Sequence, residues 1–139
     1  AFGTHSIQKS VLDFAAGNPG PLQMLQKAGV EVAQIQADHS AALLKRVERF
    51  QDPTVLAGDF NSTRDMALHY GLRDRLVDAF DTGGRGLGAT VRMGGWLPLR
   101  VDFIYNTPNI GVVSSRVLSR DCSDHRPMVS ELIVPTGSD

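Results

Sequence analysis

The feature that most constrains the fold is a short apolar run at residues 54–57, which stands between Pro53 and Gly58. The run is too short for a helix and rich in β-favouring side chains, so it predicts a buried strand. Directly upstream, apolar side chains recur at helical spacing over residues 30–50, which predicts an amphipathic helix that Pro53 ends. A helix that can cover a neighbouring strand indicates an α/β domain.

Beyond this strand the pattern changes to short helices and then to several strands. Short helices are predicted at residues 62–69, where the hydroxyl of Ser62 or Thr63 can act as the N-cap, and at residues 73–80. His39 and His69 are expected to be surface or half-buried residues of the predicted helices. The glycine-rich residues 81–95 predict a long loop. Strands are predicted at residues 89–91, 100–106, 110–118 and 128–134. The fold class is therefore α/β, with the strands concentrated toward the C-terminus.

Length, charge and composition exclude several classes of protein. The 139 residues fit one domain, and a hydrophobic content of 42% is enough to build a core. A formal net charge of −1 gives no case for strong attraction to nucleic acid, and 6% aromatic residues provide few platforms for stacking bases. No apolar run approaches the length of a membrane span, and the single cysteine excludes an internal disulfide. None of these observations indicates a compartment.

The first segment with candidate chemistry directly follows the apolar strand. In Gly58-Asp59-Phe60-Asn61, strand alternation places Asp59 and Asn61 on one side and turns Phe60 into the packing. Asp59 could accept a proton from an attacking water or hold a metal, and Asn61 could donate an amide hydrogen bond to a phosphate oxygen. The alternative is a turn whose side chains cap the following helix.

The second segment is the alternating strand RVDFIYN at residues 100–106. Apolar neighbours surround Asp102, and a buried carboxylate is unfavourable unless it is paired or hydrogen-bonded. A histidine ring nitrogen is the partner that suits catalysis, because the carboxylate would orient the ring and fix its tautomer. The alternative partner is Arg100 or a neighbouring arginine, in a purely structural salt bridge.

The third segment is Cys122-Ser123-Asp124-His125-Arg126-Pro127, a loop that leads into a strand. Adjacent Asp124 and His125 could supply a metal ligand and an imidazole that faces a phosphate, and Pro127 fixes the backbone after them. Cys122 beside His125 also allows a cysteine-nucleophile hypothesis. The glycine-rich residues 83–88 lack the Lys-Ser/Thr of a P-loop, so they predict a flexible rim where Arg85 could contact phosphate.

The order and spacing of GDFN, RVDFIYN and SDHRP resemble the endonuclease/exonuclease/phosphatase superfamily of metal-dependent phosphoesterases. The resemblance covers the chain from His5 onward and implies half of a four-layer α/β sandwich, in which two packed β-sheets are flanked by helices. It also implies in-line attack by water on a phosphoester, with Mg²⁺ or Mn²⁺ neutralising the phosphate. The substrate class, whether small molecule, lipid or nucleic acid, stays open.

The resemblance also implies a role for each matching residue. Asp59 would orient or deprotonate the attacking water, and Asn61 would position the phosphate. Asp102 would pair with His125, which would contact the scissile phosphate and stabilise its developing charge. His5 resembles a second phosphate-binding histidine, although Ser6 follows it where the family usually has an apolar residue. The implied metal ligands are Asp124, Asp59 and Asn61.

The chain departs from the family in one respect, because the first half of the family domain supplies an asparagine and a glutamate that hold the principal metal. Nothing before His5 can supply these ligands, and the first residue is Ala1 rather than Met. We therefore expect residues 1–139 to be the C-terminal half of one domain. We also expect the chain to form a homo-oligomer or to belong with an N-terminal half. The alternative function is a truncated, inactive fragment that oligomerises.

Overall fold

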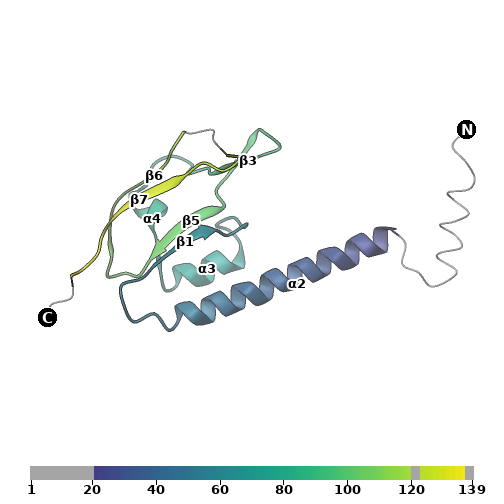
Figure 1. Cartoon of the computed structure of the whole chain (residues 1–139), viewed down its shortest axis with the longest axis horizontal. Helices are drawn as coiled ribbons and strands as arrows, with labels where there is room; N and C mark the ends of the chain where they lie inside the picture. The colour runs from purple at the N-terminus through teal and green to yellow at the C-terminus, as the bar shows by residue number, and fades with distance from the viewer. Residues whose placement is uncertain (1–20, 120–122, 137–139) are drawn as a thin grey trace, which may run out of the picture. The chain divides into compact units, whose positions relative to one another are not determined.

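The computed structural model describes residues 21–119 and 123–136. Contacts divide the chain into two units, residues 1–42 and residues 43–139. Helix α2 (Pro21–Val47) begins in the first unit and ends in the second (Figure 1). The predicted helix is confirmed, but it begins earlier, because a proline is tolerated in the first turn of a helix, where its missing N–H has no intrahelical partner. Within the described residues, no helix has both the length and the apolar character needed to cross a membrane.

Three antiparallel strands form the sheet that carries most of the candidate chemistry. The strand order is β1 (Val55–Asp59), β5 (Asp102–Asn106) and β2 (Val77–Asp78), with β5 in the centre. The predicted strands at residues 54–57 and 100–106 are thus confirmed. The prediction that the first strand is buried is wrong: β1 lies at the sheet edge, and Val55 is 45% exposed while Leu56 packs toward the core.

The core of the second unit lies against this sheet. The end of α2, the α3 helix (Ala67–Arg73) and strand β5 supply the side chains. The fully or nearly buried members are Val47, Leu72, Leu76, Phe103 and Tyr105. Figure 1 shows α3 on one side of the sheet, and the α4 and β6–β7 segments on the other.

Both predicted short helices differ from the structure. The first begins only at Ala67, and its N-cap residue Met66 makes no side-chain capping bond, because methionine has no side-chain oxygen to accept one. The hydroxyl of Ser62, one of the predicted caps, contacts His69 instead. The predicted helix at residues 73–80 is wrong. Val77 joins the sheet, and the carboxylate of Asp78 accepts hydrogen bonds from the next backbone N–H groups, so the helix α4 (Ala79–Gly83) begins there.

The glycine-rich stretch, predicted as a long loop with a strand at residues 89–91, contains a β-hairpin whose first strand begins only at Val91. Strands β3 (Val91–Met93) and β4 (Leu97–Leu99) pair antiparallel, and Gly94 and Gly95 turn the chain with φ angles of 61° and 79°. Such angles favour glycine because a Cβ atom is strained there. A glycine pair between two β-rich segments is the sequence signal for this hairpin.

The last two strands, β6 (Gly111–Val117) and β7 (Met128–Ile133), form an antiparallel ribbon with a register irregularity between Val112 and Ser114. Helix α4 packs on one face of β6. These strands match the predicted ones closely. The expected α/β class is confirmed, since helices and several antiparallel sheets build the structure, and this arrangement is consistent with part of the implied sandwich.

Candidate active site

Strand pairing brings two acids together at one end of the central sheet. In the register of β1 and β5, Asp59 lies opposite Asp102. The loop before β7 adds His125, and one ligand atom from each of the three residues lies within 4.8 Å of the others. Asp59 is exposed, while Asp102 and His125 are partly buried. Three segments that are far apart in the sequence thus form one group, which we call the open cluster: Asp59, Asp102 and His125.

Within the open cluster, Asp102 and His125 form a hydrogen-bonded pair. The Nδ1 atom of His125 lies 2.8 Å from Oδ2 of Asp102. A carboxylate can only accept, so Nδ1 carries the hydrogen, and the second ring nitrogen, Nε2, lies outside this bond. This confirms the expected pairing, and Arg100, named as an alternative partner, pairs with Asp78 instead.

The carboxylates around His125 favour its charged form. The hydrogen bond that His125 donates to Asp102 raises the pKa of His125 above the usual 6.5. Burial, the second-largest effect, lowers this pKa, and the charges of Asp102, Asp59 and Asp124 raise it further. A cationic imidazole at an open sheet edge is suited to bind an anion such as a phosphoester.

The backbone turns sharply after Asp59. The N–H of Asn61 donates to Oδ1 of Asp59 at 2.8 Å, and Asn61 has a left-handed φ of 48°. The simple alternation predicted for this segment therefore ends at Phe60. That ring packs edge-on against Phe103 and Tyr105, as predicted. The turn does not cap α3, whose N-cap is Met66.

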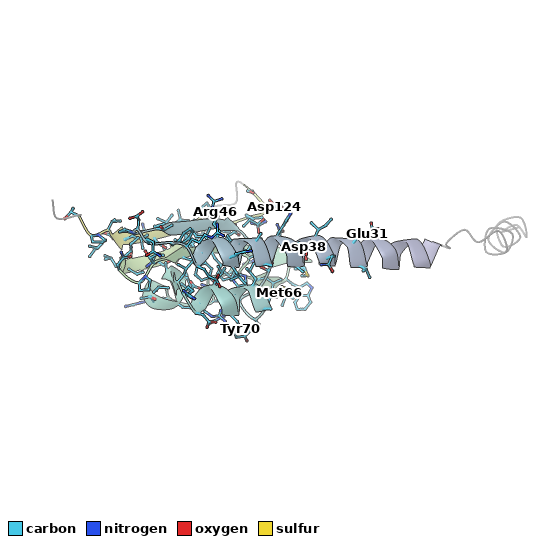
Figure 2. The ribbon with its side chains drawn as sticks, turned by 90° about the horizontal axis from the view of Figure 1, so that it is seen from below. Glu31, Asp38, Arg46, Met66, Tyr70 and Asp124 are labelled. Atoms are coloured by element: carbon cyan, nitrogen blue, oxygen red, sulfur yellow. The ribbon has the colours of Figure 1, made fainter. Side chains whose placement is uncertain are left out.

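The remaining predicted site residues are not part of the open cluster or lie outside the described residues. Asn61 is exposed beside Asp59, and its role stays a prediction. Asp124 is at the surface (Figure 2), where a hydrogen bond from the Ser123 hydroxyl lowers its pKa, so its predicted metal role also stays untested. His5 and Cys122 lie outside the described residues. Arg85 is exposed in its loop.

A buried histidine lies behind the turn that follows Asp59. His69 has no exposed surface; its Nδ1 lies 2.8 Å from the Tyr105 hydroxyl and its Nε2 lies 2.9 Å from the Ser62 hydroxyl. Burial lowers the pKa of His69, so the neutral ring is favoured. The prediction that this residue is at the surface or half-buried is wrong. The sequence signal for this burial is helical spacing, because His69 precedes the core residue Leu72 by three positions on α3 and therefore lies on the same face of the helix.

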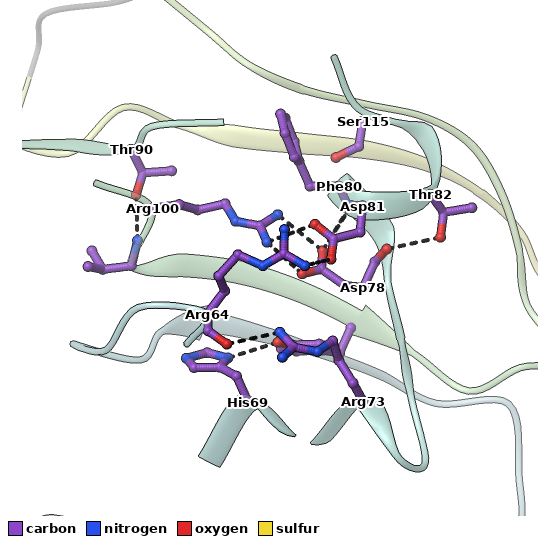
Figure 3. Close-up of polar contacts among 12 residues, drawn as sticks. Arg64, His69, Arg73, Asp78, Phe80, Asp81, Thr82, Thr90, Arg100 and Ser115 are labelled. Atoms are coloured by element: carbon purple, nitrogen blue, oxygen red, sulfur yellow. Dashed lines mark hydrogen bonds and ion pairs between the residues drawn. The ribbon is translucent and has the colours of Figure 1, made fainter. Parts of the chain in front are cut away.

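A network of ion pairs holds the chain just before Asp102 (Figure 3). Arg100 binds Asp78 through both guanidinium NH₂ groups, at 2.7 and 3.2 Å, and it also contacts Asp81. Its guanidinium group lies 4.5 Å from the ring centre of Phe103. Asp81 in turn binds Arg64, which is 51% exposed. This network fixes the entry into β5.

Thr90 connects the hairpin to the open cluster. Its hydroxyl oxygen accepts hydrogen bonds from the backbone N–H groups of Val101 and Asp102 at 3.2 and 3.3 Å. Its carbonyl accepts the N–H of Arg126 at 2.7 Å. A single buried threonine therefore ties the base of the hairpin to the segments that carry Asp102 and His125.

Comparison with known proteins adds to this geometry. A model of the Endonuclease/Exonuclease/phosphatase family matches residues 25–125. No curated protein sequence matches the chain.

Solved structures show the same fold. An endonuclease/exonuclease/phosphatase from Bacteroides vulgatus is 22% identical, with a TM-score of 0.62 over 73% of this chain and 45% of that one. A protein of unknown function from Enterococcus faecalis is 21% identical, with a TM-score of 0.57 over 68% and 42% of the two chains. A mannosyl-6-phosphatase from Bacteroides thetaiotaomicron is 23% identical, with a TM-score of 0.53 over 70% and 44%.

The present chain spans less than half the length of each of these structures. The family model, by contrast, covers well over half of the chain, including Asp59, Asp102 and His125. This protein belongs to the endonuclease/exonuclease/phosphatase family.

Proposed function

We propose that the intact protein is a metal-dependent phosphoesterase, which hydrolyses a phosphoester by attack of an activated water. The observation that carries this proposal is the open cluster, in which Asp102 orients His125 and favours its charged form beside the exposed carboxylate of Asp59. Membership of the endonuclease/exonuclease/phosphatase family and the fold shared with a mannosyl-6-phosphatase support the same reaction class.

Each residue of the open cluster has a distinct role in this proposal. His125, whose charged form Asp102 favours, binds a phosphate oxygen and stabilises the charge that develops on it. Asp59 orients the attacking water and accepts its proton, because it is an exposed carboxylate within reach of the same space. Asn61 adds an amide hydrogen bond to the phosphate from the neighbouring position.

The donor set fits a hard divalent cation such as Mg²⁺ or Mn²⁺. Carboxylate oxygens are the ligands that these ions prefer, and the open cluster offers two carboxylates close together. Asp59 and Asp102 are the residues that would hold the ion, with Asn61 and Asp124 as predicted additional ligands. A bound divalent ion would neutralise phosphate charge and lower the pKa of a bound water.

We further propose that residues 1–139 are the C-terminal half of a catalytic domain, which is completed by an N-terminal half or by self-association. The similar structures are more than twice as long as the matched region. The outer face of the β6–β7 ribbon exposes Val113, Val129 and Ile133, which are 50%, 41% and 64% exposed. Light scattering combined with intact mass measures the state of association, and a stable monomer of 15.0 kDa would contradict this proposal.

The test of the proposed function is hydrolysis of chromogenic phosphomonoesters and phosphodiesters by the full-length protein, with Mg²⁺, with Mn²⁺ and with EDTA. We expect Asp59→Ala and His125→Ala to lower turnover by about 10² or more, the usual contribution of a positioned acid, base or charge-stabilising group. The matched controls are the exposed residues Asp74 and His39, whose alanine variants should keep normal turnover. Absence of hydrolysis would contradict the proposed phosphoesterase function and favour the inactive alternative. Hydrolysis that persists in EDTA would contradict the metal dependence.

A further inference from the structure

The tip of the β3–β4 hairpin exposes large apolar side chains. Met93 is 58% exposed, Trp96 78% and Leu97 37%. Met93 and Leu97 are paired across the two strands, so their side chains share one face next to the Gly94-Gly95 turn. Large apolar side chains grouped at the surface mark a site of interaction. We call this group the hairpin tip: Met93, Trp96 and Leu97.

Charge sets the hairpin tip apart from an ordinary protein-binding surface. No aspartate or glutamate occurs between Asp81 and Asp102, although the chain as a whole is slightly acidic. The exposed Arg92 precedes Met93 directly. Tryptophan has an apolar body with a polar N–H, and arginine has an apolar stem with a charged head, so both suit the boundary between water and lipid.

The hairpin is fixed to the candidate site at its base. Thr90 accepts hydrogen bonds from the backbone of Asp102 and of Arg126, the neighbour of His125. Each hairpin strand has three residues. At roughly 3.3 Å per residue the hairpin tip therefore extends about 10 Å from this base. A surface that receives the hairpin tip would consequently lie next to the open cluster.

We propose that the hairpin tip docks on an anionic phospholipid surface and that the substrate is a phosphoester presented at that surface, a phospholipid headgroup. Trp96, Met93 and Leu97 enter the headgroup boundary, and Arg92 pairs with anionic lipid phosphates. The docking rests on the exposed side chains and their charge alone, whereas the substrate class also rests on the proposed phosphoesterase function.

Docking is measured first, without turnover. Full-length protein is sedimented in EDTA with vesicles of phosphatidylcholine alone or of phosphatidylcholine with phosphatidylglycerol. We expect stronger binding to the anionic vesicles. Trp96→Ala should weaken it about tenfold, and Arg92→Glu about fivefold or more, because each basic residue near an anionic membrane contributes about this factor. The matched controls are Tyr70→Ala, an exposed aromatic residue on α3 (Figure 2), and Arg49→Glu, an exposed arginine just after α2, which should bind normally.

Fluorescence of Trp96, taken as the difference between the wild type and Trp96→Phe, identifies the occupant. A blue shift on adding anionic vesicles, together with strong iodide quenching before they are added, supports the proposal. Weak iodide quenching in the free protein would show that another part of the protein covers Trp96, and this result overturns the proposal. Equal vesicle binding by Trp96→Ala and Tyr70→Ala overturns it as well.

Hydrolysis then separates docking from the proposed function. Trp96→Ala should keep its rate on a soluble chromogenic phosphoester and lose about tenfold on phospholipid in vesicles. An equal loss on both substrates would assign Trp96 to the reaction site and overturn the docking role. If the wild type hydrolyses neither substrate, the proposed function fails, while the vesicle-binding result still decides the docking.

Discussion

Two histidines at the same sheet have opposite environments. His125, in the open cluster, is bound to a carboxylate and its pKa is raised. His69 is fully buried between two hydroxyl groups, and burial lowers its pKa. Its ring centre lies 4.1 Å from that of Phe103, with the two rings tilted by 35°. We call the buried polar residues next to Phe103 the interior cluster: His69, Tyr105, Asp78 and Arg100. The comparison teaches that a charge partner at the surface makes a histidine chemically useful, while burial makes it part of the core.

The largest effect on stability should come from the ion pair of the interior cluster. Replacing Arg100 with Met leaves the carboxylate of Asp78, whose side chain is 1% exposed, buried without its partner. We expect the free energy of unfolding to fall by about 3–5 kcal/mol, the usual result of breaking a buried pair. The control is Arg64→Met, which removes an exposed partner of Asp81 and should cost about 0–1 kcal/mol in denaturant unfolding. Equal losses of unfolding free energy in the two variants would contradict the distinction between the buried and the exposed ion pair.

The next largest effect should be the loss of turnover when the acid that pairs with His125 in the open cluster is replaced. Asp102→Asn keeps the shape of the side chain but removes the carboxylate that fixes and charges His125. Turnover of a chromogenic phosphoester should fall on the order of 10² or more, with little change in unfolding. A variant that keeps both its turnover and the raised pKa of His125 would remove Asp102 from the proposed mechanism.

A smaller effect is expected from one hydroxyl in the interior cluster. Tyr105→Phe removes the hydrogen bond to Nδ1 of His69 and leaves a buried ring nitrogen without that partner. The free energy of unfolding should fall by about 1–2 kcal/mol, whereas Tyr70→Phe at the surface should change it by less than about 0.5 kcal/mol. Turnover should be unaffected by either change, which distinguishes Tyr105 from Asp102.

The finest test is a proton NMR titration of the two imidazole rings, assigned with His69→Gln and His125→Gln. His69 should titrate below 6.5 and His125 above it. The signs of their contributions to stability are opposite. The stability that His125 contributes is fully present below pH 6.5 and is lost as the pH rises through the pKa of His125 in the folded protein. The stability that His69 contributes is fully present above pH 6.5 and is lost as the pH falls through the pKa of His69 in the folded protein. Midpoints on the same side of 6.5 would contradict the comparison.

Local patterns predicted the open cluster better than the interior cluster. The alternation of RVDFIYN and the apolar run before GDFN located β5 and β1, and an acid among apolar neighbours predicted a partner for Asp102. The pairing register, which places Asp59 opposite Asp102, is a tertiary property that no single segment contains.

Long-range contacts explain the predictions that were wrong. Residues 73–80 have a helical pattern, yet Val77 gains a strand partner in Asn106, and Asp78 gains Arg100. Tertiary pairing of this kind overrides weak helical preference. His69 was predicted outside the core because polar residues are usually exposed. Its burial is favourable because the hydroxyls of Tyr105 and Ser62 bind its two ring nitrogens, and the sequence pattern does not reveal these contacts.

Because Asp59 lies opposite Asp102 in the pairing of β1 and β5, the proposed activity depends on the correct register of these two strands. Side chains alternate along β5, so a slip by one residue would bring Phe103 opposite Asp59 and turn the Asp102 carboxylate toward the core. Such a product could keep its helices and much of its strand content, yet it would have no open cluster. For this chain, activity per molecule would therefore report the fraction of correctly registered sheets, which circular dichroism cannot resolve.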